Sequence, residues 1–358
     1  MSDYFEIDFL DVESNKSGDA IPLRYTLNGL SYIHVVDGGF QDTGQAVVDH
    51  INKHYGNPTF IDHVVVTHPD GDHAGGLRKV LEDFQVGALW MLRPWLYAEE
   101  LIDRFERYSS VENLASRLKE LYPNIEALEE LAEIYGVPIY EPFQGTMIGA
   151  FTVMAPTKTR YLDLVVESER TPKPAKEEKE ASTAWSGLLG ALEKAAILIR
   201  AAWGDESFST DDTSAENEMS VVQYANLCGK RILLTGDAGR NALWEAAAYA
   251  PYVGLQLPGI DRFQVPHHGS RRNVSTDLLD YWLGERLDKK PDETTFSALI
   301  SSAKADEHHP RKAVIRACIH RGAAVASTEG KAIRTSFNAP ERGWSPVTPL
   351  PYPDDQEA

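Results

Sequence analysis

The chain carries, at residues 67–76, the sequence Thr-His-Pro-Asp-Gly-Asp-His-Ala-Gly-Gly. Four side chains that can bind a metal fall within six positions, namely His68, Asp70, Asp72 and His73. Residues 64–66 are apolar and β-branched and predict a buried strand. The following residues predict a helix with one apolar face, formed by Leu77, Val80, Leu81 and Phe84. A short turn between strand and helix lets the four side chains converge, and imidazole with carboxylate suits Zn²⁺, Mn²⁺ or Fe.

Two later stretches also place a ligand-type side chain after an apolar run. Residues 233–237 read Leu-Leu-Thr-Gly-Asp, and residues 265–270 read Val-Pro-His-His-Gly-Ser. A polar loop whose aspartates cap a helix is the alternative for the first stretch alone. The two further stretches favour a metal site.

In this order, the three stretches resemble the metallo-β-lactamase superfamily. More narrowly, they resemble the soluble metallo-β-lactamase domain of ComEC-type competence proteins. Shorter segments agree with that resemblance, at residues 9–12, 18–20, 36–39, 301–310 and 330–333. The resemblance covers roughly residues 5–157 and 218–337. It implies an α/β fold, a four-layer αββα sandwich, with a helical segment inserted in it.

The resemblance also implies two divalent metal ions, Zn²⁺ or Mn²⁺, bridged by an aspartate and a water or hydroxide. The expected ligands are His68 and Asp70 for the first ion, Asp72 and His73 for the second, Asp237 between them, and His267 to complete the second site. Two such ions lower the pKa of a bridging water and stabilise the attacking and leaving oxygens.

Either member of the histidine pair could complete the second site. His267 is favoured because it lies closer to the end of the strand, and His268 would then face the substrate. Asp72 and His268 are the expected catalytic residues.

The chain departs from the superfamily pattern in two places. Asp70 stands where most members have histidine, and a carboxylate there makes the first site harder and more tolerant of Mn²⁺. No histidine precedes the strand at residues 220–222, so Glu216 or Asn217 could approach the metal instead. A depleted first site could also mean a single, firmly held ion.

Four further residues have expected supporting roles. Asp37 is expected to orient a metal ligand through a hydrogen bond, or else to be a turn residue before two glycines. Asn217 is the other expected supporting residue. Ser270, with the backbone N–H groups around it, could hold a phosphate oxygen. His309 lies near the substrate according to the resemblance, with a plain surface loop as the alternative.

The composition is that of a globular protein, with 42% hydrophobic and 25% charged residues among 358. No stretch reaches the roughly 20 apolar residues of a membrane span, and we expect no signal peptide and no membrane contact. Two cysteines, Cys228 and Cys318, are too few for a disulfide framework. We therefore expect reduced cysteines and a cytoplasmic location.

The formal net charge of −19 argues against tight binding to free, long nucleic acid. Such binding depends on lysine and arginine that neutralise phosphates and release counterions. A small phosphoester, or a nucleic acid delivered by a basic partner, fits this charge better.

The expected organisation is a hydrolase domain over residues 1–337, an insertion over 158–217 and a Pro-rich tail over 338–358. The insertion is predicted to hold a charged linker and an amphipathic helix over residues 185–203. That helix either packs back on its own domain or makes a homodimer or partner contact. The tail is expected to be an extended strap or a frayed end.

These features predict a metal-dependent hydrolase, with a phosphodiesterase or nuclease-like activity favoured. The alternatives are an ester, lactone or thioester hydrolase that uses the same site, and a regulatory or assembly subunit that acts through the inserted helix.

Overall fold

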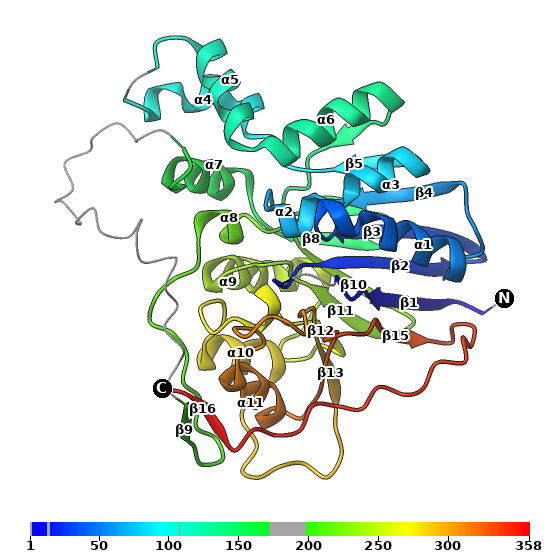
Figure 1. Cartoon of the computed structure of the whole chain (residues 1–358). Coiled ribbons are helices and arrows are strands. Elements are labelled where there is room, and N and C mark those ends of the chain that lie inside the picture. The colour runs from blue at the N-terminus through cyan, green and yellow to red at the C-terminus, as the bar shows by residue number, and fades with distance from the viewer. Residues whose placement is uncertain (1, 13–14, 107, 172–197) are drawn as a thin grey trace.

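Two large β-sheets face each other in the computed structural model, which describes residues 2–12, 15–106, 108–171 and 198–358 (Figure 1). The first sheet has the order β15-β1-β2-β3-β4-β5-β6. Its strands are β1 (Tyr4–Phe9), β2 (Ala20–Leu27), β3 (Leu30–Gly38), β4 (Phe60–Val65), β5 (Gln85–Trp90), β6 (Ile139–Tyr140) and β15 (Ile333–Phe337). Strands β3 to β6 run parallel, and the others pair antiparallel.

The second sheet has the order β14-β13-β12-β11-β10-β8-β7. Its strands are β7 (Met147–Ile148), β8 (Phe151–Ala155), β10 (Val222–Leu227), β11 (Lys230–Leu234), β12 (Arg262–Gln264), β13 (Phe296–Ile300) and β14 (Ala323–Ser327). Strands β11 to β14 run parallel. The carboxyl ends of parallel strands share one edge of a sheet, so the loops that follow them collect there.

Helices cover the outer faces of both sheets (Figure 1). They are α1 (Gly44–His54), α2 (Gly71–Ala74), α3 (Leu77–Asp83), α4 (Ala98–Leu101), α5 (Val111–Leu121), α6 (Pro123–Tyr135), α7 (Lys158–Glu167), α8 (Ala215–Glu218), α9 (Arg240–Tyr249), α10 (Thr276–Leu283) and α11 (Lys312–His320). None of the helices in the described ranges is long and apolar enough to cross a membrane.

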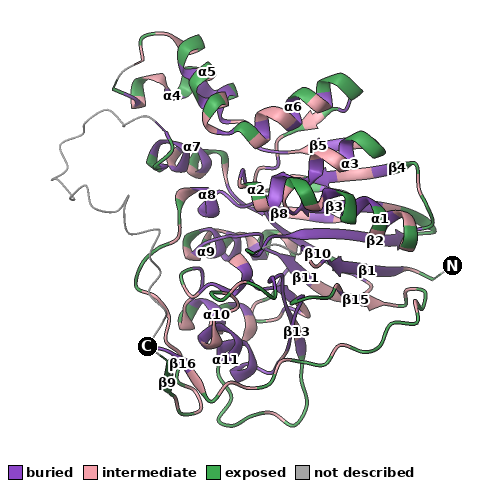
Figure 2. Cartoon of the chain, in the orientation of Figure 1, coloured by how far each residue is buried: buried purple, intermediate pink, exposed green. Residues whose placement is uncertain are grey.

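Alternation along the strands of the second sheet shows that both of its faces are covered. On β11, Ile232 and Leu234 belong to the apolar cluster shared with the first sheet, whereas Leu233 belongs to the cluster under α9, α10 and α11. Successive side chains of a strand point to opposite faces. Figure 2 accordingly shows the strands of this sheet largely buried. The predicted four-layer αββα sandwich is therefore confirmed.

The insertion differs from its sequence-based description where the structure describes it. Lys158–Glu167 forms helix α7, whose residues Tyr161, Leu164 and Val165 are buried in the core. Most of the helix expected over residues 185–203 lies outside the described residues. At its described end, Leu198–Arg200 forms strand β9, so the helical pattern does not extend to Trp203.

The C-terminal segment is an extended strap that runs from the end of β15 along the lower side of the molecule to β16 (Figure 1). Residues 339–353 contain no helix or strand, and the segment ends in β16 (Asp355–Glu357), which pairs with β9. The Glu357 carboxylate accepts hydrogen bonds from the first two N–H groups of α11, those of Lys312 and Ala313, both at 3.0 Å. A carboxylate at a helix N-terminus accepts hydrogen bonds from N–H groups that have no partner within the helix, and its negative charge interacts favourably with the helix dipole.

The strap also neutralises a buried acidic pair on β1. Glu6 and Asp8 are fully buried, and the Arg342 guanidinium of the strap contacts both, at 2.7 Å and 2.9 Å. Burial alone would raise the pKa of Asp8, but His50, Arg342 and the Tyr55 hydroxyl outweigh it and hold that pKa below its usual value. Asp8 is therefore charged, and its charge needs these partners.

We predict that Arg342→Met lowers the free energy of unfolding by about 3–5 kcal/mol, the usual cost of leaving one partner of a buried ion pair uncompensated. Urea denaturation would measure it. Arg117→Met is the matched control, because its pair with Glu120 is exposed, at 48% and 64%, and should contribute less than about 1 kcal/mol. Equal losses in the two variants would contradict the role given to the strap.

Candidate metal centre

The metal-binding side chains come from loops at the edge where the two sheets meet. His68 and Asp70 follow β4, and Asp72 and His73 lie on the single-turn helix α2. The backbone just after α2 approaches β3 closely. A Cβ on Gly76 would overlap the carbonyl oxygen of Gly38, so this position requires glycine. The two adjacent glycines of the motif thus let α2 pack directly on the end of β3.

Asp237, which follows β11, lies at the middle of the cluster. Its Oδ1 is 3.2 Å from Nε2 of His73 and 3.9 Å from Nε2 of His268. Its Oδ2 is 3.8 Å from Nε2 of His68. Asp72 approaches from the other side, with Oδ2 at 3.7 Å from Nε2 of His268. These separations suit atoms that share a cation between them.

The side chains form three-residue groups whose ligand atoms all lie within 4.8 Å of one another. The groups are His68–His73–Asp237, Asp72–His73–His268, Asp19–Asp237–His268 and Asp19–Asp37–His73.

Each imidazole of the cluster is held with Nδ1 turned outward to a hydrogen-bond partner. Nδ1 of His73 donates to Asp37 Oδ2 at 2.7 Å, and Nδ1 of His268 donates to the carbonyl oxygen of Ser301 at 3.0 Å. The Thr67 hydroxyl donates to Asp37, so its oxygen accepts from Nδ1 of His68 at 3.1 Å. A proton on each Nδ1 leaves the Nε2 lone pair facing the cluster, as metal binding requires.

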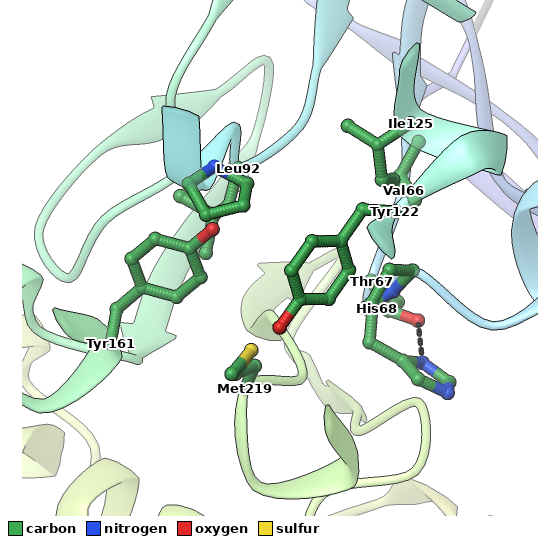
Figure 3. Close-up of a pocket in the computed structure, with 10 residues that line it drawn as sticks. Val66, Thr67, His68, Leu92, Tyr122, Ile125, Tyr161 and Met219 are labelled. Atoms are coloured by element: carbon green, nitrogen blue, oxygen red, sulfur yellow. Dashed lines mark hydrogen bonds between the residues drawn. The ribbon is translucent and has the colours of Figure 1, made fainter. Parts of the chain in front are cut away.

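A small apolar pocket lies beside His68 (Figure 3). Its walls include Tyr122, Tyr161 and Met219, and Figure 3 also shows the hydrogen bond between Thr67 and His68. These side chains help to keep the imidazole fully buried.

The histidines of the centre differ in the direction in which their surroundings shift the pKa. Burial would lower the pKa of His268, but the nearby carboxylates of Asp237, Asp72 and Asp19 raise it to about 9. His73 behaves similarly, because the carboxylates of Asp237 and Asp37 overcome burial and raise its pKa well above the ordinary value. Burial, with His73 beside it, lowers the pKa of His68.

The histidine pair differs from the favoured assignment. His268, only 4% exposed, enters the groups of ligand atoms, whereas His267 is 26% exposed and enters none of those among the described residues. Both residues have left-handed backbones, at φ 48° and 54°. Two consecutive left-handed residues turn the chain sharply, and this turn directs the second imidazole inward.

His267 instead sits in a polar rim. Its Nδ1 lies 3.0 Å from Asn217 Nδ2 and 3.0 Å from Asn273 Oδ1. Its Nε2 is 3.6 Å from Asp237 Oδ2. The predicted supporting residue Asn217 therefore contacts His267, and through it the edge of the cluster.

Other predicted residues lie around the cluster. Asp70 is 3.8 Å from His68 and is paired with Arg170. His309 packs on His267, with ring centroids 5.7 Å apart. Ser270 is buried, and its N–H donates to the carbonyl oxygen of His267. Glu216 faces Ser168 and Arg170 rather than the cluster.

Asp19 is the main residue that the sequence-based ligand set missed. It lies in the turn before β2, and its Oδ2 accepts a hydrogen bond from Gln264 at 2.8 Å. Gly18 allows the backbone next to Asp19 to approach the Asp72 carbonyl oxygen, because a Cβ at residue 18 would lie only 2.6 Å from that oxygen. Burial, with Asp237 close by, raises the pKa of Asp19 despite attraction to His73 and His268. The Gly-Asp pair before a strand was its sequence signature.

Comparison with known families finds a match over part of the chain. Residues 33–138 match the family model described as "Metallo-beta-lactamase superfamily". Over this range the chain is similar to the metallo-β-lactamase superfamily. The matched range includes the motif that holds His68, Asp72 and His73. A comparison with curated proteins finds no match.

Two solved structures in the same superfamily resemble the chain distantly. One, titled hydrolase AbOPH in the beta lactamase superfamily, is 11% identical with a TM-score of 0.30, over 61% of this chain and 56% of that chain. The other, metallo-beta-lactamase SMB-1 bound to 2-mercaptoethanesulfonate, is 10% identical with a TM-score of 0.31, over 71% and 77%. The chain thus spans about half the length of the first of these. The narrower resemblance to ComEC-type domains stays a prediction.

The residues of this cluster fit a metal centre. Within the described part of the chain, five buried atoms of the cluster have no hydrogen-bond partner: Asp19 Oδ1, His68 Nε2, His73 Nε2, Asp237 Oδ1 and His268 Nε2. Buried polar atoms are normally paired, because an unpaired one costs about 1–3 kcal/mol. A divalent cation would satisfy several of them at once.

We predict that Asp37→Asn weakens Zn²⁺ or Mn²⁺ binding by roughly 10–100-fold, the usual effect of changing a partner that orients a ligand. An amide oxygen is a weaker acceptor for Nδ1 of His73, and the amide could turn a donor toward it. Competition with a chromophoric chelator would measure the affinity. Asp62→Asn is the control, since Asp62 accepts from Ile33 away from the centre. Equal affinity in Asp37→Asn and wild type would contradict the orienting role.

Metal binding should also depend on pH in a definite direction. His268 has a pKa of about 9 without metal, so at neutral pH an entering ion must displace its proton. Apparent affinity should therefore rise with pH through about 9. Titration calorimetry in buffers of different ionisation enthalpy would count the protons released. A heat of binding that is independent of the buffer would contradict the prediction.

The same proton affects the stability of the metal-free fold. Because the folded-state pKa of His268 is raised, its contribution is fully present below the unfolded value of about 6.5. That contribution is lost as the pH rises through about 9.

Proposed function

We propose that this chain is a metal-dependent hydrolase of phosphodiester bonds. The observation that carries the proposal is the set of buried imidazole and carboxylate atoms that face one another without hydrogen bonds. Divalent ions bound there would polarise a phosphoryl oxygen and make water nucleophilic near neutral pH.

The donor set favours hard ions and therefore phosphoryl chemistry. Asp19, Asp72 and Asp237 contribute carboxylate oxygens, and Asp70 stands at the edge. Oxygen-rich sites suit Mn²⁺ as well as Zn²⁺. Phosphodiesters carry a negative charge that such ions attract, whereas lactones and thioesters are neutral at the reacting group.

An open groove leads to the partly exposed carboxylates of Asp70 and Asp72. Its other lining residues are Lys16, Phe40, Gln41, Asp42, Gly71, Gly75 and Asn124. Lys16 and Phe40 offer a cation and an aromatic ring to a phosphate and its organic group. Asp42 and the net charge of −19 argue against a long polyanion bound without a partner. A small phosphodiester, or a strand delivered by a basic partner, is the proposed substrate.

His309 is the proposed proton acceptor at the edge of the centre, because burial lowers its pKa and leaves Nε2 unprotonated near neutral pH. Its Nδ1 lies 3.2 Å from Asp306 Oδ2, and that carboxylate also accepts from the Ser17 hydroxyl at 2.7 Å. Since Asp306 holds the Nδ1 proton, Nε2 is the nitrogen that can exchange a proton with substrate. His268, whose Nε2 faces the cluster, is assigned to metal binding, and Ser270 keeps the proposed phosphate contact.

We predict hydrolysis of bis-p-nitrophenyl phosphate by the protein loaded with Mn²⁺ or Zn²⁺. His73→Ala should reduce turnover below about one hundredth, a larger loss than the 10–100-fold typical of residues that only orient a ligand. His54→Ala is the matched control, because His54 packs on Trp344 and lies outside the cluster. Release of nitrophenolate would be followed optically.

The rival activities have distinct outcomes in the same assay series. Turnover of nitrocefin, a lactone or a thioester without phosphodiester turnover would replace the proposed substrate class. Full activity of His73→Ala against each responsive substrate would overturn the assigned site. Metal binding without turnover of any substrate would favour a regulatory or assembly subunit.

A further inference from the structure

Arg170 places a positive charge beside the carboxylate that was expected to bind the first metal ion. Its Nη2 donates to Asp70 Oδ1 at 2.6 Å, and its Nε lies 3.6 Å from Glu216 Oε1. The other Asp70 oxygen is 3.8 Å from Nε2 of His68. The guanidinium therefore lies on the same carboxylate that faces His68.

The backbone just after α7 holds Arg170 in this position. The Arg170 N–H donates to the Ser168 hydroxyl oxygen at 3.1 Å, and that hydroxyl in turn donates to Glu216. The Thr171 hydroxyl donates to the Ser168 carbonyl oxygen at 2.9 Å. Ser168, Thr171 and Glu216 are buried, so the turn that carries Arg170 is anchored.

The two halves of the centre consequently differ in charge compensation. Asp237, His73, His268 and also His68 have buried atoms without hydrogen-bond partners, so the two halves differ at the carboxylate of Asp70 and not at the imidazoles. Asp70 has no such atom among the described residues and enters none of the compact ligand groups found there. The Arg170 guanidinium already lies on Asp70, whereas Asp72 and Asp237 face imidazoles of the cluster.

We propose that Arg170 is a built-in cation at the first metal position, so that the chain holds one divalent ion firmly, at Asp72, His73, Asp237 and His268. A second ion would bind His68 and Asp70 only when Arg170 leaves the carboxylate. Arg170 is thus a positioning residue that controls metal stoichiometry. The proposal rests on the metal binding inferred above, but not on the choice of phosphodiesters as substrate.

The test compares metal binding in Arg170→Gln, Arg170→Lys and wild type. If guanidinium pairing and the second ion compete for the Asp70 carboxylate, as proposed, Arg170→Gln should tighten binding of a second Mn²⁺ or Zn²⁺ by roughly 5–150-fold, the usual range for coupled sites. Arg170→Lys keeps the charge and should stay close to wild type. Elemental analysis after equilibrium dialysis gives the stoichiometry, and a Co²⁺ titration followed by visible absorbance gives both affinities.

Arg104→Gln is the matched control, because Arg104 pairs with Asp163 of α7, at 3.0 Å, away from the centre. Thermal unfolding of each variant would verify that it is folded. One ion per wild-type chain and two per Arg170→Gln chain, with the control unchanged, would support the proposal.

Four results would overturn it. Two tightly bound ions in wild type, or one ion in every variant, would mean that Arg170 does not control the first position. A second ion in Arg170→Lys as readily as in Arg170→Gln would mean that charge is not the cause. The absence of any bound ion would overturn the metal-dependent function itself, and the role of Arg170 with it.

Discussion

The carboxylate of Asp37 fixes the geometry on which the rest of the centre depends. It accepts hydrogen bonds from the Thr67 N–H at 2.8 Å, the Thr67 hydroxyl at 2.6 Å and Nδ1 of His73 at 2.7 Å. One side chain at the end of β3 thus determines the path of the loop after β4 and the orientation of α2. Since the Thr67 hydroxyl also orients His68, two of the three inward-facing imidazoles depend on this carboxylate.

The second sheet is tied to this arrangement by polar contacts rather than by apolar packing alone. Gln264, buried on β12, donates to Asp19 and accepts from the N–H groups of Thr235 and Gly236, just before Asp237. Asp306 similarly joins Ser17 of the first half to His309 of the second. These ties set the spacing between ligands from different sheets, to which a metal site is sensitive.

Local patterns in the sequence were sufficient for the fold and for the convergence of His68, Asp72 and His73. The apolar run at residues 64–66 and the ligands that follow it form one local unit, so their convergence could be predicted. Two adjacent histidines cannot be told apart by spacing, because the backbone angles of His267 and His268 decide which ring turns inward. Asp19 and Arg170 enter through tertiary contacts, the latter with a residue 100 positions away in sequence.

Strand β9 illustrates the same limit in the fold. Its residues continued a helical spacing of apolar side chains, but its pairing partner is β16, near the C-terminus. A helix-like period reports which side chains share a face only if the segment is helical, and a distant partner strand can override it.

Charge balance explains how one set of loops can serve the centre with and without metal. Asp37, Asp72 and Asp237 lie beside imidazoles, so their mutual repulsion needs positive charge in either state. Without metal, raised pKa values keep protons on His73 and His268. A bound divalent ion would supply that charge in place of those protons. The exchange of two protons for one divalent ion would leave the net charge of the buried cluster unchanged, so the loops that Asp37 holds would keep their charge balance.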